Sequence, residues 1–181
     1  MVTWLDMHRE GSPQVALIDA NAERLDEREL RTRARSLGEA VGADMVSRSY
    51  CHPYALVARH TGPIGVDIER VVACPEEFSQ AICTPAEKES GRWITDRELI
   101  SLWSSKEALS KALGDALDYD PRRLGSPAAW PGGACGPWRT AALPTPDGYC
   151  AWVCWRQPSG SAIGEKKPPL KGTQPAMAPP S

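Results

Sequence analysis

The spacing of apolar residues along the chain predicts two longer helices and a set of short strands. Apolar residues recur at helical spacing within residues 22–41 and again within residues 96–113, where Gly114 follows as a typical helix end. Short apolar runs between turn residues predict strands at residues 15–18, 54–58, 64–69, 138–143 and 149–155.

Turn residues between these elements indicate how the chain connects them. Residues 61–63 separate two predicted strands that we expect to form a hairpin, and residues 146–148 separate the last two in the same way. Thr84, with a proline directly after it and Glu87 three positions on, predicts the start of a further helix. Residues 126–136 are rich in proline and glycine and predict a loop.

Together the elements predict an α+β protein with two similar halves, each a helix packed on a small, mostly antiparallel sheet. The expected folded domain is 1–157, with an N-terminal half of about 1–62 and a C-terminal half of about 63–157. Proline, glycine, lysine and serine dominate after this domain, so residues 158–181 are predicted to be a disordered tail.

Composition and charge exclude several classes of protein. A net charge of −2 over 181 residues gives no support to a general nucleic-acid binder. No apolar run approaches the roughly 20 residues of a membrane helix, and no basic stretch followed by an apolar one marks a signal peptide. The six cysteines contain no C-x-x-C pair. Because no export signal is seen, we expect reduced thiols in a cytoplasmic protein, with Cys150 and Cys154 as buried small side chains.

Two carboxylates mark the predicted strand over residues 64–69. Asp67 and Glu69 are two positions apart and therefore leave the same face, while Val66 and Ile68 point to the other face, into a core. Adjacent carboxylates repel each other and favour a cation between them, and oxygen ligands favour Mg²⁺ or Ca²⁺. The alternative is that one of them faces water and that Glu69 pairs with a neighbouring base.

Charged residues interrupt the apolar arc of the helix over residues 96–113. Lys106 falls inside this arc, where a charge must be paired or must reach solvent along its stem. Glu107 and Lys111 lie four apart at the edge of the arc and form either an ordinary surface pair or a strip bordering a cleft. In the second case Glu107 is a third metal ligand beside the two strand carboxylates, and the set suits a metal clamping a pyrophosphate.

Two segments resemble the signatures of a known family. Residues 65–69, GVDIE, resemble the first signature of the 4'-phosphopantetheinyl transferases, and residues 103–114, WSSKEALSKALG, resemble the second, W-x-x-K-E-A-x-x-K-x-x-G. The resemblance covers roughly residues 47–155 and is closest to the single-chain, surfactin-type branch, in which two similar α+β halves form the active cleft. The shorter trimeric branch has its aspartate signature near the N-terminus, whereas 64 residues precede Gly65 here.

The resemblance implies a role for each matching residue. Asp67, Glu69 and Glu107 would bind Mg²⁺, which also contacts the pyrophosphate of coenzyme A. Lys106 and Lys111 would contact phosphate or the reacting centre.

The resemblance also implies the reaction. A serine of an acyl or peptidyl carrier protein attacks the β-phosphate of coenzyme A, the 4'-phosphopantetheine arm is transferred, and 3',5'-ADP leaves. Glu87 matches a family glutamate between the signatures, so Glu87, Glu107 and Lys111 are the expected catalytic residues. Whether Glu87, Glu107 or a metal-bound water takes the serine proton stays open at this point. We expect a monomer, acting on carriers of polyketide, peptide or fatty-acid synthesis; the branch tends to serve secondary metabolism.

The chain departs from the family pattern at residues 47–51. Many members carry S-L-S-H-S where this chain has SRSYC, so Tyr50 replaces the family histidine, and His52 lies two residues later on the same strand face. We expect Arg48, Ser49 and Tyr50 to contact coenzyme A. The N-terminal half is also short for this branch. Its candidates for the 3'-phosphate of coenzyme A are Arg24, Arg31, Arg33 and Arg35.

These departures define the alternatives to an active transferase. One is a non-catalytic homologue that binds coenzyme A or a carrier protein. Another is an unrelated Mg²⁺-dependent phosphate-ester hydrolase. The products distinguish the three functions: a pantetheinylated carrier, a bound but unreacted ligand, or free phosphate.

Overall fold

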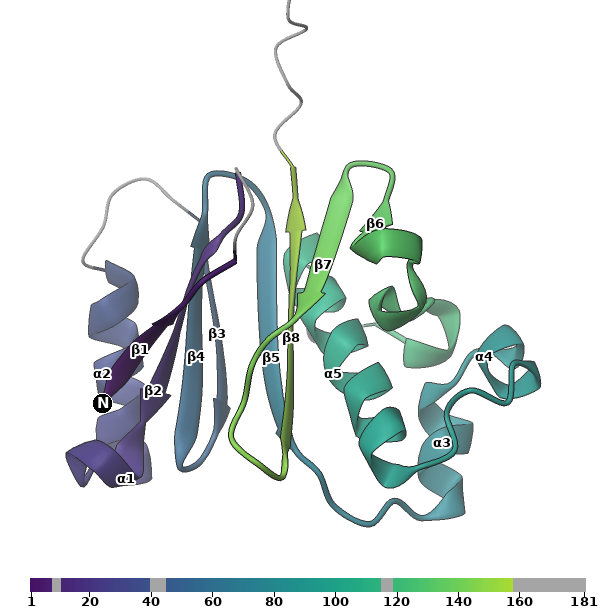
Figure 1. Ribbon diagram of the computed structural model, residues 1–181, viewed down its shortest axis with the longest axis horizontal. Helices are drawn as coiled ribbons and strands as arrows, with labels where there is room; N and C mark the ends of the chain where they lie inside the picture. The colour runs from purple at the N-terminus through teal and green to yellow at the C-terminus, as the bar shows by residue number, and fades with distance from the viewer. Residues whose placement is uncertain (8–10, 40–44, 115–118, 158–181) are drawn as a thin grey trace, which may run out of the picture.

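The computed structural model describes residues 1–7, 11–39, 45–114 and 119–157, and it shows an α+β fold with two four-stranded antiparallel sheets (Figure 1). The first sheet has the order β1 (Val2–Leu5), β2 (Gln14–Asp19), β4 (Tyr54–His60) and β3 (Met45–Cys51). The second has the order β5 (Ile64–Arg70), β8 (Tyr149–Arg156), β7 (Trp138–Ala142) and β6 (Ala134–Cys135). The predicted fold class is confirmed.

Helices flank each sheet on its outer side. The helix α2 (Glu27–Glu39) follows the short α1 (Ala20–Glu23) and packs on the first sheet, and α5 (Asp96–Leu113) packs on the second (Figure 1). The helices α3 (Glu76–Ile82) and α4 (Pro85–Glu89) precede α5. Three 3-10 turns follow it: η1 (Pro121–Arg123), η2 (Pro127–Ala129) and η3 (Pro131–Gly133). No helix in the described parts of the chain is long and apolar enough to cross a membrane.

The two sheets share one apolar core. Leu56 and Ala58 of β4 lie in it together with Val66 and Ile68 of β5 and Val153 of β8, all of them buried. The side chains of Val66 and Ile68 therefore enter the core as the strand alternation predicted. The remaining face of β5, which carries Asp67 and Glu69, is directed away from this core.

Local sequence signals explain most of the element boundaries. The long helix begins as predicted, with a capping box between Thr95 and Glu98, and it ends at Gly114, whose φ of 89° is left-handed. The first helical segment is split, because Arg24 adopts a left-handed φ of 54° and ends α1 before α2 begins. Cys150 and Cys154 are buried, as expected.

The predicted hairpin between residues 54–58 and 64–69 is wrong. β4 lies between β2 and β3 and has no free edge for β5, which pairs with β8 instead. The hairpin of β7 and β8 is confirmed. The predicted tail, residues 158–181, lies outside the described residues, so that prediction stays untested.

The edge strands β3 and β5 meet through serine side chains, with no backbone pairing between them. The backbone N–H of Val66 donates to Ser47 Oγ at 3.1 Å, and that of Ile68 donates to Ser49 Oγ at 3.3 Å. These contacts satisfy amides of β5 that a sheet edge would otherwise leave unpaired. We call this contact line between β3 and β5 the seam.

Candidate functional site

Asp67 lies at the seam, on the face of β5 that is turned toward α5. Gly65 makes this approach possible, because a Cβ at its position would collide with the Ala108 carbonyl of α5. Asp67 is 2% exposed, and its Oδ1 accepts hydrogen bonds from Lys111 Nζ at 2.6 Å and from Ser49 Oγ at 2.8 Å. Its Oδ2 is buried and has no hydrogen-bond partner. An unpartnered, buried carboxylate oxygen is costly unless a ligand completes the site.

Glu69 continues the acidic face of β5. Its Oε1 accepts a hydrogen bond from Trp103 Nε1 at 3.3 Å. Burial raises the pKa of Glu69 to about 7, and the negative charge of Asp67 adds to the rise. A carboxylate held in so unfavourable a setting is stabilised by any cation that binds next to it.

Glu107 approaches the same region from α5. Its Oε1 accepts a hydrogen bond from the hydroxyl of Tyr119 at 2.8 Å. Burial raises the pKa of Glu107, and the charge of Asp67 adds to this effect. Glu107 in turn raises the pKa of Glu69. The three predicted carboxylates are therefore brought close enough to repel one another.

The chemistry of this donor set fits a hard divalent cation. Among the described residues, no group of three or more histidine, cysteine, aspartate or glutamate side chains is arranged so that it could hold a metal ion as it stands. Each carboxylate instead uses one oxygen on a protein donor: Lys111 and Ser49, Trp103 or Tyr119. The buried Oδ2 of Asp67 remains without a partner, and three carboxylates beside one ammonium leave an excess of negative charge.

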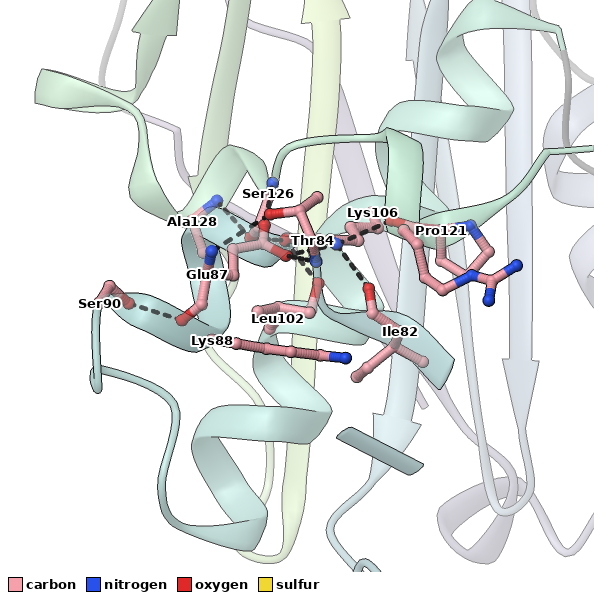
Figure 2. A network of polar contacts seen from close by, with 12 residues as sticks. Ile82, Thr84, Glu87, Lys88, Ser90, Leu102, Lys106, Pro121, Ser126 and Ala128 are labelled. Carbon is pink, nitrogen blue, oxygen red and sulfur yellow. Dashed lines mark hydrogen bonds and ion pairs between the residues drawn. The ribbon is translucent and has the colours of Figure 1, made fainter. Parts of the chain in front are cut away.

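Lys106 and Glu87 form a separate, buried network (Figure 2). Lys106 is 0% exposed, and its Nζ donates to Glu87 Oε2 at 2.6 Å, to the Ile82 carbonyl at 2.6 Å and to the Pro121 carbonyl at 2.9 Å. The ammonium of Lys106 is therefore paired inside the protein and does not reach solvent, which is one of the two alternatives given by its place in the apolar arc.

Glu87 has both carboxylate oxygens engaged in this network. Its Oε2 also accepts from the backbone N–H of Thr84 at 2.8 Å, and its Oε1 accepts from that of Ser126 at 2.7 Å. The network therefore joins α4 and α5 to the end of α3, to η1 and to the residue before η2 (Figure 2). No polar contact among the described residues connects Glu87 or Lys106 to the three carboxylates.

The strand alternation of β3 separates the other predicted contacts of coenzyme A. Ser49 faces the seam, whereas Arg48 and Tyr50 face α2. Arg48 Nε donates to the Ala34 carbonyl at 3.3 Å, and the guanidinium of Arg31 lies 4.8 Å from the centre of the Tyr50 ring. Of the three, only Ser49 contacts the acidic site.

The candidate arginines for the 3'-phosphate lie apart from the seam, on α2 and beside it. Arg31 and Arg33 form exposed ion pairs with Glu27 and Glu23 at 2.9 and 3.4 Å. Tyr119, in contrast, was absent from the sequence prediction although it contacts Glu107 directly. It lies in an irregular segment, where no periodicity marks a residue.

Comparison with known proteins matches one part of the chain to a family. Residues 63–129 match the model of the 4'-phosphopantetheinyl transferase superfamily. The matched range begins at β5 and ends with η2, so it contains the three carboxylates, Lys111 and the network of Lys106. No curated protein matches the chain.

Proposed function

We propose that this protein is a 4'-phosphopantetheinyl transferase of the single-chain, surfactin-type branch, which moves the 4'-phosphopantetheine arm of coenzyme A to a serine of a carrier protein. One observation carries the proposal. Asp67 of β5 contacts Lys111 of α5 at 2.6 Å, and the charge of Asp67 raises the pKa values of Glu69 and Glu107, all inside the range that matches the family. Two sequence motifs 34 to 44 positions apart thereby form one acidic site with a single lysine.

The residues that would hold Mg²⁺ are Asp67, Glu69 and Glu107. The bound ion would neutralise charge on the pyrophosphate of coenzyme A as 3',5'-ADP leaves. Asp67 presents its unpartnered Oδ2, while its Oδ1 stays fixed by Ser49 and Lys111. Lys111 Nζ also donates to the Val66 carbonyl at 3.2 Å, so it is held where an ammonium can attract a phosphate oxygen.

Glu107 is the proposed acceptor of the serine proton. The serine oxygen forms a bond to the β-phosphorus, the bond from this phosphorus to the leaving 3',5'-ADP breaks, and the proton passes to a carboxylate. Oε2 of Glu107 accepts no hydrogen bond from the described residues, and burial and the charge of Asp67 raise the pKa of Glu107 while no cation is bound. Glu87, the other candidate, has both oxygens engaged in the buried network, so we assign it and Lys106 a structural role.

Partner and location complete the proposal. The co-substrate is coenzyme A and the acceptor is an acyl or peptidyl carrier protein, modified by a monomer. All six cysteines are free thiols, which suits a reducing cytoplasm.

Intact-mass spectrometry of an apo carrier protein tests the proposal. Incubation with the protein, coenzyme A and Mg²⁺ should add the mass of one phosphopantetheine arm. Asp67→Asn and Glu107→Gln should abolish the gain, whereas Glu77→Gln, at an exposed carboxylate of α3, should leave it intact. No gain with any carrier type, while calorimetry still shows binding of coenzyme A, would establish the non-catalytic alternative. Release of free phosphate would establish a hydrolase.

A further inference from the structure

Tyr119 is a polar residue of the acidic site that neither signature contains. Its hydroxyl donates to Glu107 Oε1 at 2.8 Å, and the residue is half-buried. Burial and the neighbouring Glu107 both raise the pKa of Tyr119, so the hydroxyl stays protonated and remains a donor. Oε2 of Glu107 accepts no hydrogen bond from the described residues. The tyrosine therefore fixes one oxygen of the carboxylate and leaves the other available.

The buried lysine holds the segment that carries Tyr119. α5 ends at Gly114, and the Pro121 carbonyl of η1 accepts a hydrogen bond from Lys106 Nζ of α5 at 2.9 Å (Figure 2). Pro121 is two residues from Tyr119, and Lys106 is the neighbour of Glu107 on α5. The same turn of α5 therefore carries Glu107 and, through Lys106, holds the segment that contains its donor Tyr119.

Ordered donors of this kind matter for a carboxylate that repels its neighbours. Without Tyr119, Glu107 can rotate away from Asp67 toward solvent, because their like charges favour separation. The hydrogen bond from Tyr119 to Oε1 opposes this rotation and therefore also fixes the direction of Oε2. Hydrogen bonds to the groups that bind a metal commonly change its affinity about 10–100-fold.

We propose that Tyr119 is a positioning residue, which orients Glu107 for a divalent cation from a segment that Lys106 anchors. The inference rests on the proposed function only through the metal site, and it assigns Tyr119 no contact with substrate.

Titration with Mn²⁺ alone, followed by the electron paramagnetic resonance signal of the free ion, tests the role without any transfer reaction. Tyr119→Phe removes only the hydroxyl, and we expect it to weaken Mn²⁺ binding about tenfold. Tyr54→Phe is the matched control, because the Tyr54 hydroxyl has no hydrogen bond to the described residues and the ring packs on Tyr149. It should bind Mn²⁺ as the wild type does, and thermal unfolding of both variants reports their folding.

A double-mutant cycle with Glu107→Gln shows whether the tyrosine acts through Glu107. On the Glu107→Gln background, Tyr119→Phe should change the Mn²⁺ affinity no further. Equal or tighter Mn²⁺ binding by Tyr119→Phe would overturn the inference while leaving the proposed function intact. Failure of the wild type to bind Mn²⁺ would overturn both. Loss of binding by Tyr119→Phe in a protein that modifies no carrier would support the inference and count against the transferase.

Discussion

The buried ion pair of Lys106 and Glu87 predicts that Lys106→Met destabilises the fold. Methionine keeps the length and the apolar stem of lysine but leaves the Glu87 carboxylate, which is 8% exposed, without its cation. It also removes the donor from the carbonyls of Ile82 and Pro121. Removal of one partner from a buried pair costs about 3–5 kcal/mol.

Urea unfolding followed by circular dichroism measures this loss. With a slope of about 2 kcal/mol per M, the midpoint should fall by about 1.5–2.5 M urea. Lys88→Met is the control, because Lys88 is exposed and makes a single bond of 3.3 Å to the Gln80 carbonyl. Its effect should stay within about 0.5 kcal/mol.

Two outcomes would refute the reasoning. A loss from Lys106→Met no larger than that from Lys88→Met would show that the buried pair contributes nothing. Unchanged stability together with weaker binding of coenzyme A would indicate that Lys106 contacts phosphate, the role that the family resemblance implies, and not that it has a structural role. A cycle with Glu87→Gln sharpens the test, because the double variant leaves no unpaired charge and should lose less than the sum of the single variants.

Three further outcomes test packing and metal dependence. Gly65→Ala should cost about 1–3 kcal/mol in urea unfolding, because its Cβ meets the backbone of Ala108; Gly38→Ala should cost less, because it meets only the movable guanidinium of Arg48. Equal losses would contradict this contrast. Ser49→Ala should lower the free energy of unfolding by about 0.5–1.5 kcal/mol for each hydrogen bond lost at the seam, and an unchanged midpoint would contradict the role of the seam. Excess EDTA should abolish carrier modification in the intact-mass assay and added Mg²⁺ should restore it, whereas full modification in EDTA would exclude the metal.

Short-range periodicity was enough to predict the parts of the site that lie on regular elements. Strand alternation predicted Asp67 and Glu69 on one face of the strand and Val66 and Ile68 on the opposite face, in the core. The structure has this arrangement. The apolar arc of α5 marked Lys106 as a charge that needed a partner. Its partner is Glu87, 19 positions away. The spacing of residues within one helix cannot predict a partner on another element.

The errors arose where tertiary contacts decide between equally good local choices. Two adjacent strands joined by residues 61–63 look like a hairpin, yet β2 and β3 occupy both edges of β4. Tyr119 lies in an irregular segment, so neither helical nor strand spacing could mark it. Strand alternation already implied that Arg48 and Tyr50 point away from Ser49. Because Ser49 faces the seam, these two side chains face α2.

The seam explains why the acidic site is found where the two sheets join. Edge strands that pair through their backbones depend little on residue type, but β3 and β5 meet through the hydroxyls of Ser47 and Ser49. The hydroxyl of Ser49 accepts from the Ile68 amide and donates to Asp67, so one side chain both closes the sheet edge and fixes the carboxylate. Replacement of this serine therefore disturbs the join of the sheets and the acidic site together, because the two share the same hydrogen bonds.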